Sequence, residues 1–195
     1  MIYRDALAAL FTFGGIYAAG VLGWGLFELG LFGISSAATG ALGAWLGGRA
    51  DRAFGPKPVI VVAIWVLILV CATILATGRE AILFIPLAPG SRLPDITFFV
   101  AGGALGAAAG TLQAASRTLL AHQAEGRVAP AQAFGLYALA GKATAFLGPT
   151  LVAAVTALTG SQRLGVSPII LLFGIGLALL TFVETETRNA EASRA

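Results

Sequence analysis

One lysine lies within an apolar segment, where its charge is the feature that most directly suggests chemistry. Lys142 is 11 residues after Ala131, and no other charge occurs between residues 131 and 158. If the segment is a membrane helix, Lys142 lies about 17 Å from its start, near the middle of a hydrocarbon core about 30 Å thick. A charge at that depth costs about 2.5–3.5 kcal/mol, so a partner or an aqueous cavity must offset it.

Two readings of Lys142 follow. In the first it lines a substrate pathway and pairs with a substrate carboxylate or with an acid embedded in the membrane. In the second it snorkels to the surface or contacts another part of the protein. We expect no Asp or Glu of this chain at the same depth, so the partner would be substrate, solvent or a further domain.

Three other polar side chains lie within apolar segments and are further candidates for such a pathway: Tyr137, Tyr17 and Gln113. A buried tyrosine hydroxyl needs a hydrogen-bond partner, which a cavity or the packed interior can supply. Gln113 and Arg117 are four residues apart and therefore share one helix face. Gln113 could line a pore or bond to a neighbouring helix, whereas Arg117 is expected to anchor the helix at its cytoplasmic end.

The remaining reactive residue types exclude several classes of function. His122 and Cys71 are the sole histidine and cysteine, so neither a metal cluster nor a disulfide framework is expected. No phosphate-binding glycine loop is present, and no cofactor is expected. The spans hold neither a serine–histidine pair nor paired aspartates, so the sequence does not indicate an enzyme. The cations are scattered, which argues against nucleic-acid binding.

The amino-acid composition indicates the kind of fold that positions these residues. Hydrophobic residues make up 58% of the 195 and charged residues 11%, against about 25% charged in a typical soluble domain. Together with a mean hydropathy of +0.91, this predicts an all-α protein of the lipid bilayer, because helices satisfy their own backbone hydrogen bonds there. Six spans are expected, followed by a polar cytoplasmic tail at 185–195: 6–21, 27–46, 58–77, 96–120, 131–158 and 164–183.

The charges between the spans predict the orientation. With the N-terminus inside, the opposite side holds Arg79, Arg92 and Arg163. The cytoplasmic side would then hold eight cations, which favours both termini in the cytoplasm of a bacterial inner membrane: Arg4, Arg49, Arg52, Lys57, Arg117, Arg127, Arg188 and Arg194. The long connection 78–95, with an interfacial or packed loop at 81–87, divides the chain into two triplets of opposite direction. Such triplets predict a 3+3 inverted-topology repeat.

Small residues and a proline predict how the helices pack and bend. Gly102, Gly106 and Gly110 recur every four residues, which allows a close helix–helix approach. Gly148 and Pro149 predict a bend within the fifth span, because proline removes one helix hydrogen bond. That bend could move during transport or be fixed.

The connection at residues 47–58 is expected to be a tight cytoplasmic turn. It resembles the signature loop between the second and third helices of each major facilitator half, through six residues that keep the order of that motif: Gly47, Ala50, Asp51, Arg52, Gly55 and Lys57. The resemblance implies that Asp51 helps to latch the two halves of a transporter on the cytoplasmic side. It would then be a conformational latch and not a substrate ligand.

Four longer stretches resemble the C-terminal half of the vacuole-effluxer-like, autophagy-associated family of the major facilitator superfamily: 10–20, 113–117, 134–149 and 160–165. The resemblance covers almost the whole chain, and residues 135–144 are its most diagnostic part. It implies that the six spans are helices seven to twelve of a twelve-helix transporter. Its fungal members are associated with amino-acid efflux from the vacuole.

The sequence therefore predicts half of a secondary active transporter that works by alternating access and exports a small polar solute, with amino acids as one candidate. Its expected partners are the lipid bilayer, the solute, and a missing N-terminal six-helix half or a second copy of the chain. The alternatives are a non-transporting or partner-dependent six-helix membrane protein and a homodimeric six-helix carrier.

Overall fold

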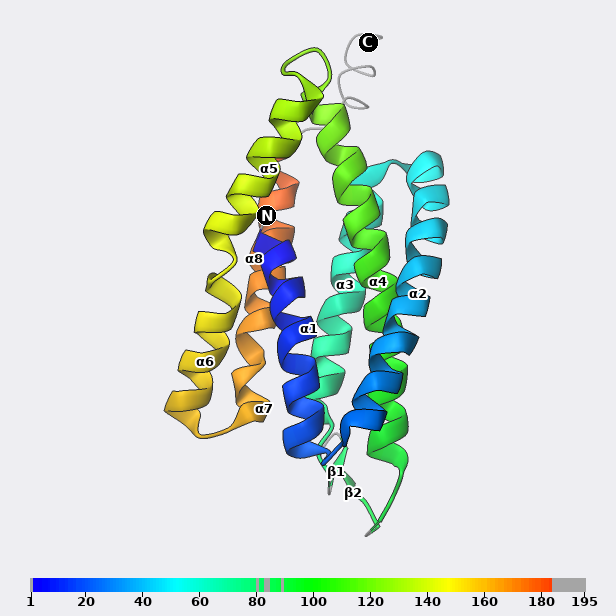
Figure 1. Ribbon diagram of the computed structural model, residues 1–195, viewed down its shortest axis with the longest axis vertical. Helices are drawn as coiled ribbons and strands as arrows, with labels where there is room; N and C mark the ends of the chain where they lie inside the picture. The colour runs from blue at the N-terminus through cyan, green and yellow to red at the C-terminus, as the bar shows by residue number, and fades with distance from the viewer. Residues whose placement is uncertain (1, 80, 83–84, 89, 184–195) are drawn as a thin grey trace.

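A computed structural model describes residues 2–79, 81–82, 85–88 and 90–183, and Figure 1 shows its helices side by side along the long axis. The helices are α1 (Ile2–Val21), α2 (Leu26–Phe54), α3 (Pro56–Ala76), α4 (Leu93–Ala124), α5 (Pro130–Thr144), α6 (Leu147–Thr159), α7 (Gln162–Gly165) and α8 (Ser167–Thr181). A two-stranded antiparallel hairpin, β1 (Ala81–Ile82) and β2 (Ile85–Pro86), lies in the connection that was expected to be a packed or interfacial loop. The tail expected at 185–195 lies outside the described residues.

Five segments of the described chain are long and apolar enough to cross a membrane. They are α2, α3, α4, the pair α5–α6 and the pair α7–α8. The all-helical prediction is therefore confirmed. The 20-residue helix α1 runs beside them without being one of the five. Its crossing of the bilayer, and with it the six-span inverted repeat, stays a prediction.

The glycine stripe of α4 packs directly on the backbone of α2. A Cβ atom built on Gly106 would lie 2.1 Å from the carbonyl oxygen of Ser36, and one on Gly110 would lie 2.0 Å from that of Gly40. One on Gly102 would lie 2.0 Å from the Phe32 ring. Atoms cannot approach so closely, so only glycine permits this helix pair.

The second helix is longer than predicted, and the tight turn expected over 47–58 is confined to Gly55, so the predicted extent of the connection is wrong. Helix α2 continues to Phe54, and the chain reverses at Gly55 with φ +82, directly before α3 starts at Pro56. Gly47 packs on Thr111 of α4, so the close contact of α2 with α4 extends beyond residue 46. The helix is continuous up to the Gly55–Pro56 pair. It ends there because proline cannot donate the next backbone hydrogen bond.

The fifth span is interrupted, as the Gly148–Pro149 pair predicted. Helix α5 ends at Thr144 and α6 begins at Leu147. Pro149 lacks the N–H that would reach Ala145, four residues earlier, and its ring crowds that carbonyl. The sixth span is likewise divided into α7 and α8 before Pro168, and the Ser167 hydroxyl donates to the Leu164 carbonyl at 2.7 Å.

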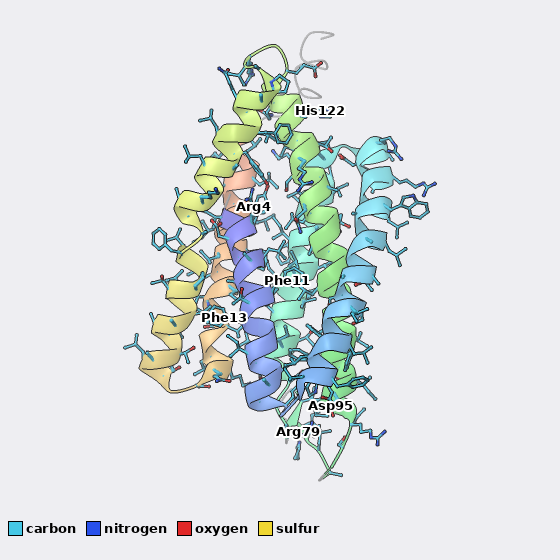
Figure 2. All side chains as sticks on the ribbon, in the orientation of Figure 1. Arg4, Phe11, Phe13, Arg79, Asp95 and His122 are labelled. Carbon is cyan, nitrogen blue, oxygen red and sulfur yellow. The ribbon has the colours of Figure 1, made fainter. Side chains whose placement is uncertain are left out.

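The core lies where α1, α3, α4 and α8 meet. Among its fully buried side chains are Phe98 of α4 and Phe173 of α8. At the end of the bundle that carries the hairpin, Asp95 accepts hydrogen bonds from Trp24 Nε1 at 2.7 Å and from Arg79 Nη1 at 2.9 Å. These contacts tie α4 to the start of α2 and the end of α3 (Figure 2).

We predict that Gly106→Ala lowers the free energy of unfolding by about 1–3 kcal/mol, the usual cost of an overpacked site. Its new methyl group would overlap the Ser36 carbonyl. Gly103→Ala is the matched control, since its Cβ would lie 3.7 Å from the nearest atom, Thr39 Cγ2. Thermal unfolding of both variants in detergent measures the difference, and equal melting temperatures would contradict the close contact.

Candidate functional site

A polar cavity of about 440 Å³ lies between α1, α4 and α5. Six residues line it: Arg4, Gln113, Arg117, Phe134, Tyr137 and Ala138. Two of them carry guanidinium groups, and two others supply an amide and a phenol. The structure thus brings together two of the sequence candidates, Gln113 and Tyr137, with two arginines that the sequence interpretation did not place in the pathway.

Arg4 reaches this cavity because α1 already begins at Ile2 and not at Ala6. Figure 2 shows Arg4 between the two ends of the bundle, nearer to the end marked by His122 than to the end marked by Arg79 and Asp95. A Cβ on Gly141 would lie 2.8 Å from the Arg4 Nη2 atom, so glycine at this position makes room for the side chain. The guanidinium carbon lies 4.7 Å from the centre of the Tyr137 ring, a cation–π contact.

The α4 side of the cavity is set by helical spacing. Gln113 and Arg117 are one turn apart on an exposed face of α4. Next to them, Ser116 is hydrogen-bonded to the Tyr3 hydroxyl at 3.1 Å, which joins α4 to the first turn of α1. This contact helps to hold Arg4 and Arg117 on opposite walls of one cavity.

A second cavity of about 550 Å³ adjoins the first, and Gln113 lines both. Its walls are mainly apolar and come from α1, α2 and α4, including Phe11, Gly15 and Gly33. Phe13 lines a different cavity, on the α6 side of α1, and Figure 2 shows Phe11 and Phe13 on opposite sides of that helix. Gln113 therefore stands where a polar compartment meets an apolar one.

Lys142 lies on α5 with an exposed side chain and does not line the polar cavity. An acid nevertheless lies beside the same segment, which the sequence did not lead us to expect. A Cβ on Gly148 would lie 3.1 Å from the Asp5 carbonyl oxygen, while Arg4 lies against Gly141, so Arg4 and Asp5 are level with residues 141–148. They were expected to precede the span, and the earlier start of α1 brings them inside.

Asp5 is a buried acid within the bundle. It is 4% exposed, and in the described part of the chain its Oδ2 atom has no hydrogen-bond partner. A carboxylate in an apolar setting is costly unless it is paired or protonated. The chain thus keeps an unsatisfied carboxyl oxygen next to the residue that enters the cavity.

Tyr17 occupies a different environment from Tyr137. It is 1% exposed, its hydroxyl donates to the Thr77 carbonyl at 2.7 Å, and its ring stacks on Phe98 with the centroids 6.0 Å apart. These contacts join α1 to α3 and α4. The Tyr17 hydroxyl thus has its hydrogen-bond partner within the packed interior, and Tyr17 is not part of the polar cavity.

Residues 47–58, which resemble the major facilitator signature loop, differ from one another in their surroundings. Asp51 is 8% exposed, and its Oδ1 atom has no hydrogen-bond partner among the described residues. Lys57 Nζ donates to the Val183 carbonyl at 2.6 Å and to that of Thr181 at 3.3 Å, which satisfies carbonyls at the end of α8. Arg52 is exposed. The latch role of this connection stays a prediction.

The sequence interpretation missed Arg4, Asp5 and Arg117 as site residues. One signal was available for Arg117, since it follows Gln113 by four residues on the same helix face. For Arg4 and Asp5 the only signal was the apolar Ile2 and Tyr3 before them. The approach of α1 to α4 and α5, which creates the cavity, has no local signature.

We predict that Tyr17→Phe lowers the free energy of unfolding by about 1 kcal/mol, the usual value of one hydrogen bond, and leaves solute recognition unchanged. The hydroxyl holds α1 to the end of α3 and does not reach the polar cavity. Thermal unfolding in detergent and ligand binding on the same preparation separate the two effects. A loss of binding without a loss of stability would instead place Tyr17 in the pathway.

Comparison with known proteins identifies the family. The sequence model of the family described as "Vacuole effluxer Atg22 like" matches residues 1–193. The "Uncharacterized MFS-type transporter YxiO" of Bacillus subtilis (strain 168) is 35% identical over 92 residues, which make up 47% of this chain and 21% of that protein. The match thus spans about a fifth of the relative's length. No solved structure matches. The chain is a multi-pass integral membrane protein that belongs to the vacuole effluxer Atg22-like family.

Proposed function

We propose that this chain forms one six-helix half of a secondary active transporter of the major facilitator type and that it exports a small polar solute by alternating access. The observation that carries the proposal is the polar cavity between α1, α4 and α5, which is lined on the α5 side by Phe134, Tyr137 and Ala138 of an otherwise apolar segment. A polar compartment beside a segment that can cross the bilayer has a use in moving a solute and is costly otherwise.

The family and the MFS-type relative support a transporter. We propose that the six segments correspond to helices seven to twelve, and that an N-terminal half or a second copy completes the pathway over the exposed faces of α1, α4 and α5. Amino acids are the solute class that the family resemblance suggests. From the distribution of cations in the sequence we propose that both termini face the cytoplasm of a bacterial inner membrane. The α2–α3 and α4–α5 connections, which lie toward the same end of the bundle in Figure 1, would face the cytoplasm too.

Two features would serve the conformational change. The interruption between Thr144 and Leu147 lets α5 tilt relative to α6 without stretching helix hydrogen bonds. Asp51, with its unpaired Oδ1 atom near the cytoplasmic end of α2, would latch onto the other half. Lys142, exposed on α5, would face that half or the solute.

The proposal is tested by transport of labelled small polar solutes into liposomes that contain the complete protein. We predict that Lys142→Ala abolishes transport while expression and folding are retained, because an exposed cation within a span must have a partner in the working transporter. Arg127→Ala, in the α4–α5 connection, removes a cation outside the bundle and is the matched control. Normal transport by the Lys142 variant would remove it from the mechanism. Absence of transport by the unaltered complete protein would favour a non-transporting role.

We further propose that Asp5 is the group through which a proton gradient is coupled to transport. Its carboxyl group is buried inside the bundle, and one of its oxygens has no hydrogen-bond partner among the described residues. The ionisable groups around this part of α1 include Tyr3 and Arg4 on the same helix, Arg117 on α4 and Tyr137 on α5. Within the described ranges of α6 and α8 no ionisable acid or base occurs.

Asp5→Asn is expected to retain solute exchange at equal concentrations and to lose accumulation driven by a pH gradient. Exchange requires the conformational cycle and the solute site, whereas accumulation also requires the proton. Both are measured in the same liposomes. Unchanged accumulation by the variant would show that Asp5 does not couple the gradient.

A further inference from the structure

The polar cavity carries an excess of positive charge. Arg4 and Arg117 both line it, and among the residues that the structure describes no aspartate or glutamate does so. Asp5, although next to Arg4 in sequence, is not a lining residue. Two guanidinium groups that face one cavity without a lining acid repel each other, and a bound anion would relieve that repulsion.

The geometry of the donors suits a carboxylate. Each guanidinium offers a planar pair of N–H donors, which matches the two oxygens of a carboxylate group. Arg4 is oriented by the Tyr137 ring beneath it at 4.7 Å, and Tyr3 joined to Ser116 fixes the neighbouring turns. The Gln113 amide adds a further donor at the far end of the cavity.

The adjoining apolar cavity indicates what the rest of the ligand is. Gln113 lines both cavities, so a ligand held at the arginines can extend past it toward Phe11, Gly15 and Gly33. These walls are small or apolar and offer no charge. A short hydrocarbon body would gain contact there, whereas a second charged group would lose hydration.

We propose that this site selects an organic anion, with a carboxylate held by Arg4 and Arg117 and an apolar body in the compartment beyond Gln113. The proposal rests on the proposed transport function, and it names organic anions as the substrate class in place of the amino acids that the family resemblance suggests. A zwitterion of the same skeleton binds less well, because its ammonium group lies next to the carboxylate and meets two guanidinium groups with no lining acid. Net negative charge is then the selective feature.

The test is equilibrium binding of labelled hexanoate to the purified complete protein in detergent. Hexanamide has the same skeleton without charge, and norleucine adds an ammonium group beside the carboxylate. Glutarate and glutaramide repeat the comparison for a molecule with two acid groups. We expect hexanoate to bind at least about tenfold more tightly than hexanamide or norleucine, because one hydrogen bond to a charged group contributes about that factor to the binding constant.

The variants assign the binding to the two arginines. Arg4→Gln and Arg117→Gln should each weaken hexanoate binding about tenfold or more and leave hexanamide unchanged. Arg127→Gln, which removes an arginine outside the cavity, should change neither. Arg117 is exposed, so its glutamine variant should fold. If the Arg4→Gln variant is unstable, Arg4→Lys replaces it, since lysine keeps the positive charge and lacks the planar pair of N–H donors.

The proposal is overturned if hexanoate does not bind more tightly than hexanamide, or if norleucine binds as tightly as hexanoate. It is also overturned if glutarate, whose second carboxylate would enter the apolar compartment, binds more tightly than hexanoate, or if the preference for hexanoate survives both arginine substitutions. If a neutral solute is transported normally while the anions fail to bind, the anion site is contradicted and the proposed transport function stands. If the protein binds the anions but transports no solute, the proposed transport function is contradicted and the anion site stands.

Discussion

The close contact between α2 and α4 is the constraint on which the arrangement of this bundle depends. Lipid offers no hydrophobic drive for helices to associate, so packing and interhelical hydrogen bonds must supply it. Here the glycines of both helices let backbone meet backbone, and Ser36 and Thr111 donate across the pair to the Gly102 and Gly43 carbonyls at 3.1 and 2.8 Å. A rigid pair results.

That contact fixes the rotation of α4 about its own axis. With the glycine stripe against α2 and the buried side of Phe98 and Leu105 in the core, Gln113 and Arg117 are left facing α1 and α5. Helix α1 then approaches α4 through Tyr3 and Ser116 and brings Arg4 to the same cavity. The charged lining of the site is thus a consequence of glycines on the other side of the helix.

Much of the fold could be predicted from the sequence, because apolar periodicity and the absence of charge are local properties. The interruption before Pro149 follows from the missing proline N–H. The third and fifth spans were predicted to start at residues 58 and 131, and the helices start close by, at Pro56 and Pro130. The length of α2 was not predicted, because glycines at 47 and 48 suggested a turn. In the bundle the first of them is a packing residue against Thr111, and the helix continues.

Sequence alone determined the membrane class, the helices, the family resemblance and the candidates Gln113 and Tyr137, since these depend on residue type and spacing. Tertiary structure decided which polar residues meet. It placed Tyr17 in the core, left Lys142 exposed, buried Asp5, and joined Arg4 to Arg117, more than a hundred positions away in the chain. The physical reason is that a charge's environment is set by neighbouring helices, and no local pattern records which helix will be the neighbour.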